Sequence, residues 1–106
     1  MRDIMKILQQ AQEMQGRMAK MQEELQAMTL TGTSGGGMVT VEANGQGLVK
    51  RVKIDPSVVN AADTEMLEDL IGVAIADAQR KAQERQQEQM GALTGGMNLP
   101  FKLPFG

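Results

Sequence analysis

Apolar side chains recur with a strict seven-residue period over the first 28 residues of the chain. They form two neighbouring rows on a helix: Ile4, Ala11, Met18 and Leu25, and Ile7, Met14, Met21 and Met28. Heptads of this kind are typical of a coiled-coil seam. A helix over both rows is roughly 37 Å long, more than a small domain ~30 Å wide can cover. We therefore predict a partner helix, most economically from a second copy of the chain, because most soluble oligomers are symmetric homodimers.

A three-stranded antiparallel meander is predicted after this helix. Its strand-like segments are 30–34, 38–43 and 48–54. The glycines of segment 35–37 favour a turn between the first two strands, because glycine adopts positive φ without steric cost. Asn44-Gly45 is typical of a type I′ hairpin and predicts the second turn.

A second long helix is predicted from about Thr64 to Met90. Asp55-Pro56 ends the sheet before it, and Asn60 or Asp63 can cap its first turn, as Asp3 can for the first helix. An early apolar stripe predicts packing against the sheet. The stripe consists of Met66, Leu67, Leu70, Ile71, Ala74, Ile75, Ala78 and Ala82. The following residues, 83–89, are polar all round, so we expect this end to leave the core.

The length and the element pattern predict one domain, residues 1–94, followed by a flexible tail, residues 95–106. The tail contains turn-forming residues and has no helical period. Its large side chains alternate with proline and lysine, so docking along a groove or a sheet edge is the alternative. These large side chains are Leu99, Phe101, Leu103 and Phe105.

Composition narrows the possible functions. The chain has no Cys, His, Trp or Tyr and a formal net charge of −2. These absences remove disulfides, thiolate metal sites, the usual general base and the usual stacking platforms for bases. No cofactor, metal site, catalytic residue or small-molecule substrate is expected, so the chain is not predicted to be an enzyme. No signal peptide or membrane span is visible, and we expect a cytoplasmic protein.

A basic stripe is predicted on the first helix, away from the apolar rows. Its cations lie within about 60° of one another at 100° per residue. They are Arg2, Lys6, Arg17 and Lys20. Glu13 and Glu24 share the face at i,i+4 spacing and predict partial neutralisation of Arg17 and Lys20. The stripe is therefore either a solvated helix face or a phosphate contact.

Two further basic clusters are candidates for phosphate contact. One lies late in the second helix, where complementarity to the helix dipole is an alternative explanation. It consists of Arg80, Lys81 and Arg85. The other lies on the third strand, where Arg51 and Lys53 share the face opposite Val52 and Ile54, with Lys50 beside them. A solvated outer sheet face is the alternative there.

Read in order, several short segments resemble the YbaB/EbfC family of small bacterial nucleoid-associated proteins over nearly the whole chain. The first block is Gly35-Gly36-Gly37-Met38-Val39, Asn44-Gly45, Gly47 and Val52-Lys53-Ile54-Asp55-Pro56. The second block is Glu68-Asp69-Leu70-Ile71, Asp77-Ala78, Lys81-Ala82, Met90 and Leu93-Thr94-Gly95-Gly96-Met97. The resemblance implies a dimeric α+β fold whose helices project like tweezer arms. It also implies DNA binding, chiefly by the helices, rather than catalysis.

The predicted function is therefore that of a nucleoid-associated protein. We expect a homodimer that binds double-stranded DNA through its phosphates with little sequence preference, and that compacts DNA or modulates gene expression. No set of side chains suited to reading base edges is evident, so any preference would come from DNA shape. The alternative is a coiled-coil adaptor that binds another protein through its Met-rich helix or its tail. No membrane partner is expected, and the predicted location is the cytoplasm, at the nucleoid.

Overall fold

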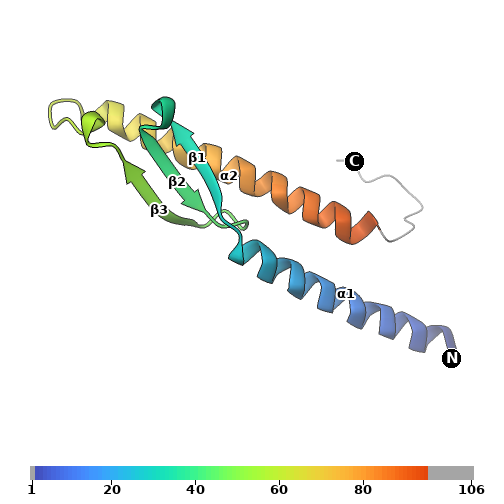
Figure 1. The fold of residues 1–106 in the computed structure, drawn as a ribbon. Coiled ribbons are helices and arrows are strands. Elements are labelled where there is room, and N and C mark those ends of the chain that lie inside the picture. Colours follow the sequence, from blue (N-terminus) through green and yellow to red (C-terminus); the bar gives the residue numbers. More distant parts are fainter. Residues whose placement is uncertain (1, 96–106) are drawn as a thin grey trace.

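The structure of the chain, a computed structural model, describes residues 2–95 and has the predicted α+β architecture (Figure 1). The elements are α1 (Arg2–Ala27), β1 (Leu30–Ser34), β2 (Val39–Ala43), β3 (Val49–Ile54) and α2 (Thr64–Gly95). The strands form one antiparallel sheet in the order β1-β2-β3, and α2 lies along one face of it. The predicted boundary of the domain at residue 94 falls at the end of α2, and the predicted tail lies outside the described residues except for Gly95.

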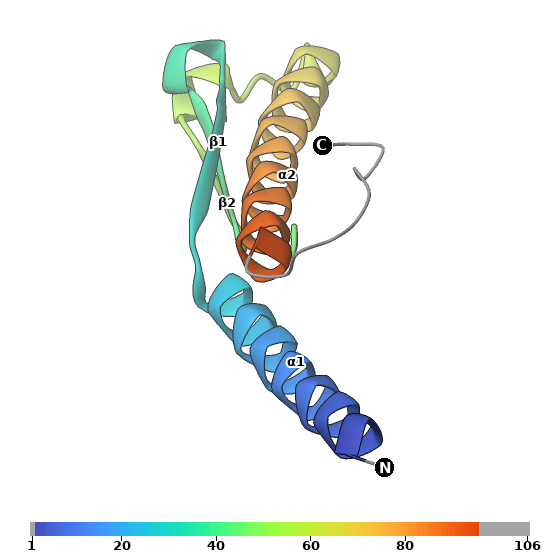
Figure 2. The same cartoon turned by 90° about the vertical axis from the view of Figure 1, so that its right-hand side faces the viewer.

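Helix α1 projects away from the sheet (Figure 2). The molecule is consequently elongated, with extents of 72 × 25 × 16 Å. The helix begins at Arg2, so Asp3 lies in its first turn instead of capping it as predicted. A carboxylate in the first turn still favours the helix, because it faces the positive end of the helix dipole.

The sheet separates an apolar face from a polar one, as period-two geometry requires. Val39, Val41 and Ala43 of β2 point towards α2 and are fully buried. Val39 is paired with Ile54 and Val41 with Val52, so β3 turns the same side chains inward as the sequence predicts. Between β1 and β2, segment 35–37 forms a turn in which all three glycines have positive φ, which confirms the prediction there.

The second hairpin differs from the prediction. A type I′ turn needs positive φ at Asn44 and Gly45, but the positive φ in this loop belongs to Gly47, at 89°. The Asn44 side chain instead accepts hydrogen bonds from the backbone N–H groups of Gln46 and Leu48, at 2.9 and 3.0 Å. Such local side-chain bonding replaces the two-residue turn by a longer loop.

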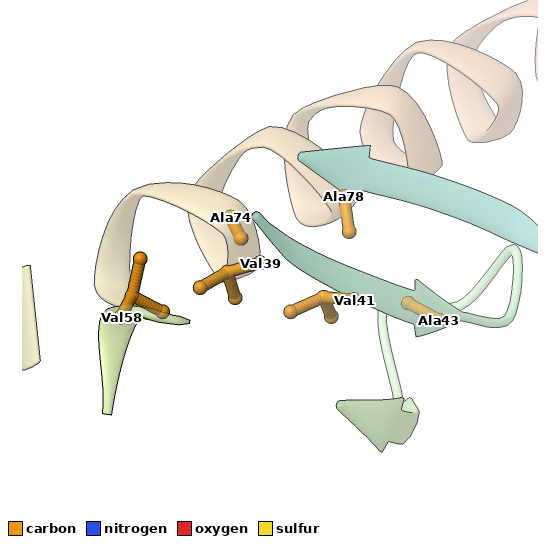
Figure 3. Packing of buried hydrophobic residues seen from close by; sticks show 6 residues of the cluster. All are labelled: Val39, Val41, Ala43, Val58, Ala74 and Ala78. Carbon is orange, nitrogen blue, oxygen red and sulfur yellow. The ribbon is translucent and has the colours of Figure 1, made fainter. Parts of the chain in front are cut away.

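Helix α2 packs on the sheet through small residues. Asp63 caps it by accepting a hydrogen bond from the backbone N–H of Met66, at 3.3 Å. Ala74 and Ala78 are fully buried against the valines of β2 (Figure 3), and Ala82 is fully buried one turn later. Gly32 of β1 completes the fit, because a Cβ there would lie within 3.0 Å of the backbone of Ala74 and Ala78. The early half of α2 therefore packs on the sheet, as predicted.

The polar end of α2 leaves the sheet, but it contacts α1 instead of entering solvent alone. The helix also continues to Gly95, beyond the predicted end at Met90. The Gln86 side-chain amide donates a hydrogen bond to the backbone oxygen of Gly45, at 2.8 Å. Gln86 and Met90 border the same small cavity as Met21 of α1. This contact holds the C-terminal end of α1 against α2.

The two predicted apolar rows of α1 are divided by this contact. Met21 and Leu25 are buried within the chain, at 6% and 2% exposure. Ile4 and Ile7 are exposed, at 59% and 61%. Among the other members of the rows, Met14 and Met28 are half-buried, whereas Ala11 and Met18 are exposed. A single copy thus covers the C-terminal part of the rows and leaves the N-terminal part open.

Candidate nucleic-acid interface

The α2 basic cluster is neutralised by neighbouring carboxylates on its own helix. Arg80 contacts Asp77 at 2.8 Å and Glu84 at 2.7 Å. Lys81 lies 3.4 Å from Asp77. The third cation, Arg85, contacts Glu88 at 2.9 Å. The structure therefore brings the three predicted cations together, but each one already has an anionic partner.

Asp77 is the centre of this network. Its pKa is lowered to about 2, first by the hydrogen bond from the backbone N–H of Thr33 and then by the hydrogen bond from Arg80. Arg80 in turn has a raised pKa because of the same pair and the nearby charge of Glu84. Both groups therefore stay charged at neutral pH, and a phosphate approaching Arg80 also meets two carboxylates.

Lys6, Arg17 and Lys20 of the α1 stripe have no such partners among the side chains that the structure describes. Within residues 2–95 the four ion pairs shorter than 4.0 Å all lie on α2. The predicted pairs of Arg17 with Glu13 and of Lys20 with Glu24 do not form. Arg17 and Lys20 are exposed and border a cleft of about 320 Å³ between α1 and the end of α2, where Leu93 forms part of the opposite wall. Their donors are thus available to an external anion.

The β3 cluster lies on the sheet face that α2 does not cover. Arg51 and Lys53 project from this outer face, opposite Glu42 and Thr40 of β2 in the strand register. Both are exposed, and neither has a carboxylate within ion-pair distance in the part of the chain that the structure describes. Lys50 donates a hydrogen bond to the backbone oxygen of Gln26 at 3.3 Å, which links the start of β3 to the end of α1.

Sequence reasoning missed a structural role of two charged residues on α2. Lys81 donates a hydrogen bond to the backbone oxygen of Thr31 at 2.7 Å, and Asp77 accepts one from the backbone N–H of Thr33 at 3.1 Å. Both groups belong to the free edge of β1. The i,i+4 spacing of Asp77 and Lys81 places them on one helix face, but nothing in the sequence says that a strand edge lies beneath it.

Neither described helix has the length and apolarity needed to cross a membrane. Over the same residues, no group of three or more acidic side chains is arranged to hold a metal ion.

Comparison with known proteins gives the family. The model of the YbaB/EbfC DNA-binding family matches residues 1–97. The chain belongs to this family. A relative from Gemmatimonas aurantiaca, named nucleoid-associated protein, is 52% identical over 103 residues, which cover 97% of this chain and 99% of the relative. The nucleoid-associated protein DP1429 of Desulfotalea psychrophila is 49% identical over 92% of each chain.

The fold of the YbaB/EbfC chain is also found in a solved structure. The crystal structure of the uncharacterized protein HP0035 from Helicobacter pylori superimposes with a TM-score of 0.76 at 25% identity. The match covers 84% of this chain and 94% of HP0035. The family match therefore agrees with the resemblance noted in the sequence, and with the arrangement of two long helices around a three-stranded sheet.

Proposed function

We propose that this chain binds duplex DNA as a homodimer, mainly through phosphate contacts and with little sequence preference. Bound in this way at the nucleoid, in the cytoplasm, it compacts DNA or modulates gene expression. Membership of a DNA-binding family supports the ligand, and the distribution of charge supports the mode of contact.

The observation that carries the proposal is the difference between paired and available cations. Arg17 and Lys20 on α1 and Arg51 and Lys53 on β3 are exposed, and the described residues hold no carboxylate within ion-pair distance of them. Lysine and arginine side chains in this state release counterions from DNA when they bind phosphates, which supplies most non-specific affinity. The α2 cations must first exchange a carboxylate for a phosphate, so we expect them to contribute less.

The homodimer is supported by the open part of the α1 rows. Ile4, Ile7 and Met18 remain 59%, 61% and 40% exposed in a single copy. A second α1 placed along the same rows would cover these side chains by coiled-coil packing. It would also duplicate each cation by symmetry, so that one duplex meets two sets of phosphate contacts.

The test is a salt series with two matched double variants. Arg17→Ala with Lys20→Ala removes two available cations from α1, and Arg80→Ala with Lys81→Ala removes two paired cations from α2. Each lost phosphate contact should lower the slope of log K against log salt by about one per contact. We expect this fall for the α1 variant and a clearly smaller one for the α2 variant, measured by fluorescence anisotropy.

Unrelated duplexes of equal length serve as the control for sequence preference. Similar affinities across them, at every salt concentration, are expected for phosphate contact. Equal slopes for both variants and the parent protein would contradict the assignment to α1. Absence of binding to all duplexes at low salt would instead favour the adaptor role.

A further inference from the structure

The loop between β2 and β3 contains a chemically labile pair, Asn44-Gly45. An asparagine before glycine is prone to lose its side-chain amide, because glycine has no side chain to hinder attack by its own backbone nitrogen. The fold needs both residues. The Asn44 side chain shapes the loop, and a Cβ at residue 45 would lie 2.8 Å from both the carbonyl oxygen and Cδ2 of Leu25 in α1. Close approach of α1 therefore requires the labile pair.

The loop favours attack on the side-chain amide of Asn44. Its oxygen Oδ1 accepts hydrogen bonds from the backbone N–H groups of Gln46 and Leu48, at 2.9 and 3.0 Å. Attack on Cγ moves negative charge onto this oxygen. Two backbone donors at these distances stabilise such a developing charge. The nitrogen that can attack belongs to the next residue, Gly45.

Helix α1 blocks this nitrogen. The N–H of Gly45 donates a hydrogen bond to the backbone oxygen of Leu25, at 2.7 Å. The nitrogen must lose its proton before it attacks, and a peptide oxygen is too weak a base to take it. Both loop residues are also buried, with Asn44 at 1% exposure, so hydroxide does not reach them. Attached α1 thus holds the proton in place and excludes the base.

We propose that Asn44 is a self-modification site that reacts when the C-terminal end of α1 separates from the loop. Hydroxide removes the proton of the Gly45 nitrogen, and this nitrogen forms a bond to Cγ of Asn44. The bond from Cγ to Nδ2 breaks, and Nδ2 leaves as ammonia with a proton from water. Water then opens the resulting succinimide ring at either carbonyl, which leaves aspartate or isoaspartate at position 44.

The modification makes the release of α1 permanent. Isoaspartate adds one atom to the main chain before Gly45, so the N–H of this residue no longer meets the oxygen of Leu25. Aspartate preserves the main chain, but its charge disfavours the buried position of Asn44. Arg17 and Lys20 of α1 would then no longer be held beside the end of α2. The reaction itself does not depend on DNA binding.

The rate of amide loss at Asn44 tests the proposal in the full-length protein. Mass spectrometry of tryptic peptides measures the loss, and chromatography separates the two products. In mildly alkaline buffer we expect the folded parent to react at least about tenfold more slowly than the same chain in concentrated urea, because only the open fraction reacts. Asn60, which is exposed and precedes alanine, is the internal reference. Equal rates at Asn44 in the folded and unfolded chain would overturn the proposed protection.

Two matched variants test whether α1 provides the protection. Leu25→Ala keeps the carbonyl group but removes a side chain that is 2% exposed, so α1 should separate more often and the rate at Asn44 should rise at least about tenfold. Leu8→Ala removes the same side chain where it is 55% exposed and should leave the rate unchanged. Circular dichroism checks the fold of both variants. Equal rates in two folded variants would overturn the role of α1.

The urea dependence of the parent decides the question even if Leu25→Ala does not fold. Separation of α1 exposes less surface than global unfolding does, so the rate at Asn44 should rise less steeply with urea than the global unfolding constant. Hydrogen exchange at the Gly45 amide should have the same shallow slope, since both reactions require this N–H to leave Leu25. A slope equal to that of global unfolding would show that the reaction needs the unfolded chain and would overturn the proposal.

Discussion

The two long helices differ in how much of their apolar surface the chain itself covers. Ala74 and Ala78 of α2 are fully buried against the sheet, whereas Ile4 and Ile7 of α1 are 59% and 61% exposed. Both helices show a clear apolar period in the sequence. An apolar period therefore shows that a helix face needs cover, and the chain topology decides whether that cover comes from the same molecule.

Connections explain the difference. A loop returns α2 along the sheet, and the small side chains at Gly32, Ala74 and Ala78 allow the backbones to approach closely. Helix α1 is joined to β1 by a two-residue connection, so it leaves the sheet at its end. Its main attachment is Leu25, whose carbonyl accepts the N–H of Gly45 at 2.7 Å.

The largest effect on stability is expected from adding a side chain to β1 at the point where α2 packs closest to it. In Gly32→Ala the new methyl group would overlap the backbone of Ala74 and Ala78. Because backbone cannot move aside as a flexible side chain does, α2 must shift from the sheet, at a cost of more than about 3 kcal/mol. Urea unfolding measures this loss. Thr33→Ala, on the outer face of the same strand, should change stability by less than about 0.5 kcal/mol, and equal losses would show that the close fit is not limiting.

The next effect concerns the open rows of α1. Ile7→Glu with Met14→Glu puts two carboxylates in the proposed seam, and burial without partners costs roughly 2 kcal/mol. This cost weakens the dimer about 30-fold. Sedimentation velocity measures the mass distribution, and circular dichroism checks that the helices remain. Gln12→Glu with Gln15→Glu, outside the rows, is the control; an unchanged dimer in the seam variant would refute the seam.

A smaller effect on stability is expected from replacing one glycine by alanine in each of the two helices. Gly16 in α1 and Gly72 in α2 both have free space where the Cβ of an alanine would lie, with nothing within 4 Å. Alanine is about 1 kcal/mol better than glycine inside a helix. We expect Gly72→Ala to raise the global unfolding free energy by about that amount, because α2 is integral to the fold. Gly16→Ala should match it only above the dimer dissociation constant, and a match at all protein concentrations would show that α1 needs no partner.

The smallest effect is a pH dependence of the contact between α2 and β1. The folded pKa of Asp77, about 2, lies below its ordinary value of 3.8. Its contribution to stability is therefore present above pH 4 and is lost as the pH falls towards 2. Asp77→Asn should be less stable than the parent at pH 7, and this difference should shrink at pH 2. Urea midpoints at both values test this, and a constant difference would indicate that the carboxylate charge is unimportant.

Most of the fold could be predicted because its signals are local. The helical period, the alternation in the strands and the Asp63 cap each depend on neighbouring residues. The structure confirms the two helices, the three strands and the cap. The prediction of a type I′ turn at Asn44-Gly45 was wrong because the side chain of Asn44 accepts hydrogen bonds from the backbone of its own loop. The end of α2 was placed too early because polar residues after Ala82 suggested solvent, whereas Gln86 bonds to the backbone of Gly45.

The candidate site was less accessible to prediction. Sequence spacing predicted that Arg51 and Lys53 lie on the outer face of β3, and the strand register agrees. It did not show which cations already have partners: Arg80 does, whereas the predicted pair of Arg17 with Glu13 does not form. Such pairing depends on rotamers, and surface ion pairs differ too little in free energy for spacing to decide between them.

Because α1 is attached to the rest of the chain near one end, its turns should open at different rates. Among the described residues, the buried part of α1 lies near Met21 and Leu25, so a single copy should open most easily from its N-terminal turns. Amide hydrogen exchange along the helix would then slow steadily from Ile4 to Leu25. A second helix lying on the open rows would protect the early turns and remove this gradient. The exchange rates of one helix thus record, residue by residue, how long its exposed half stays covered.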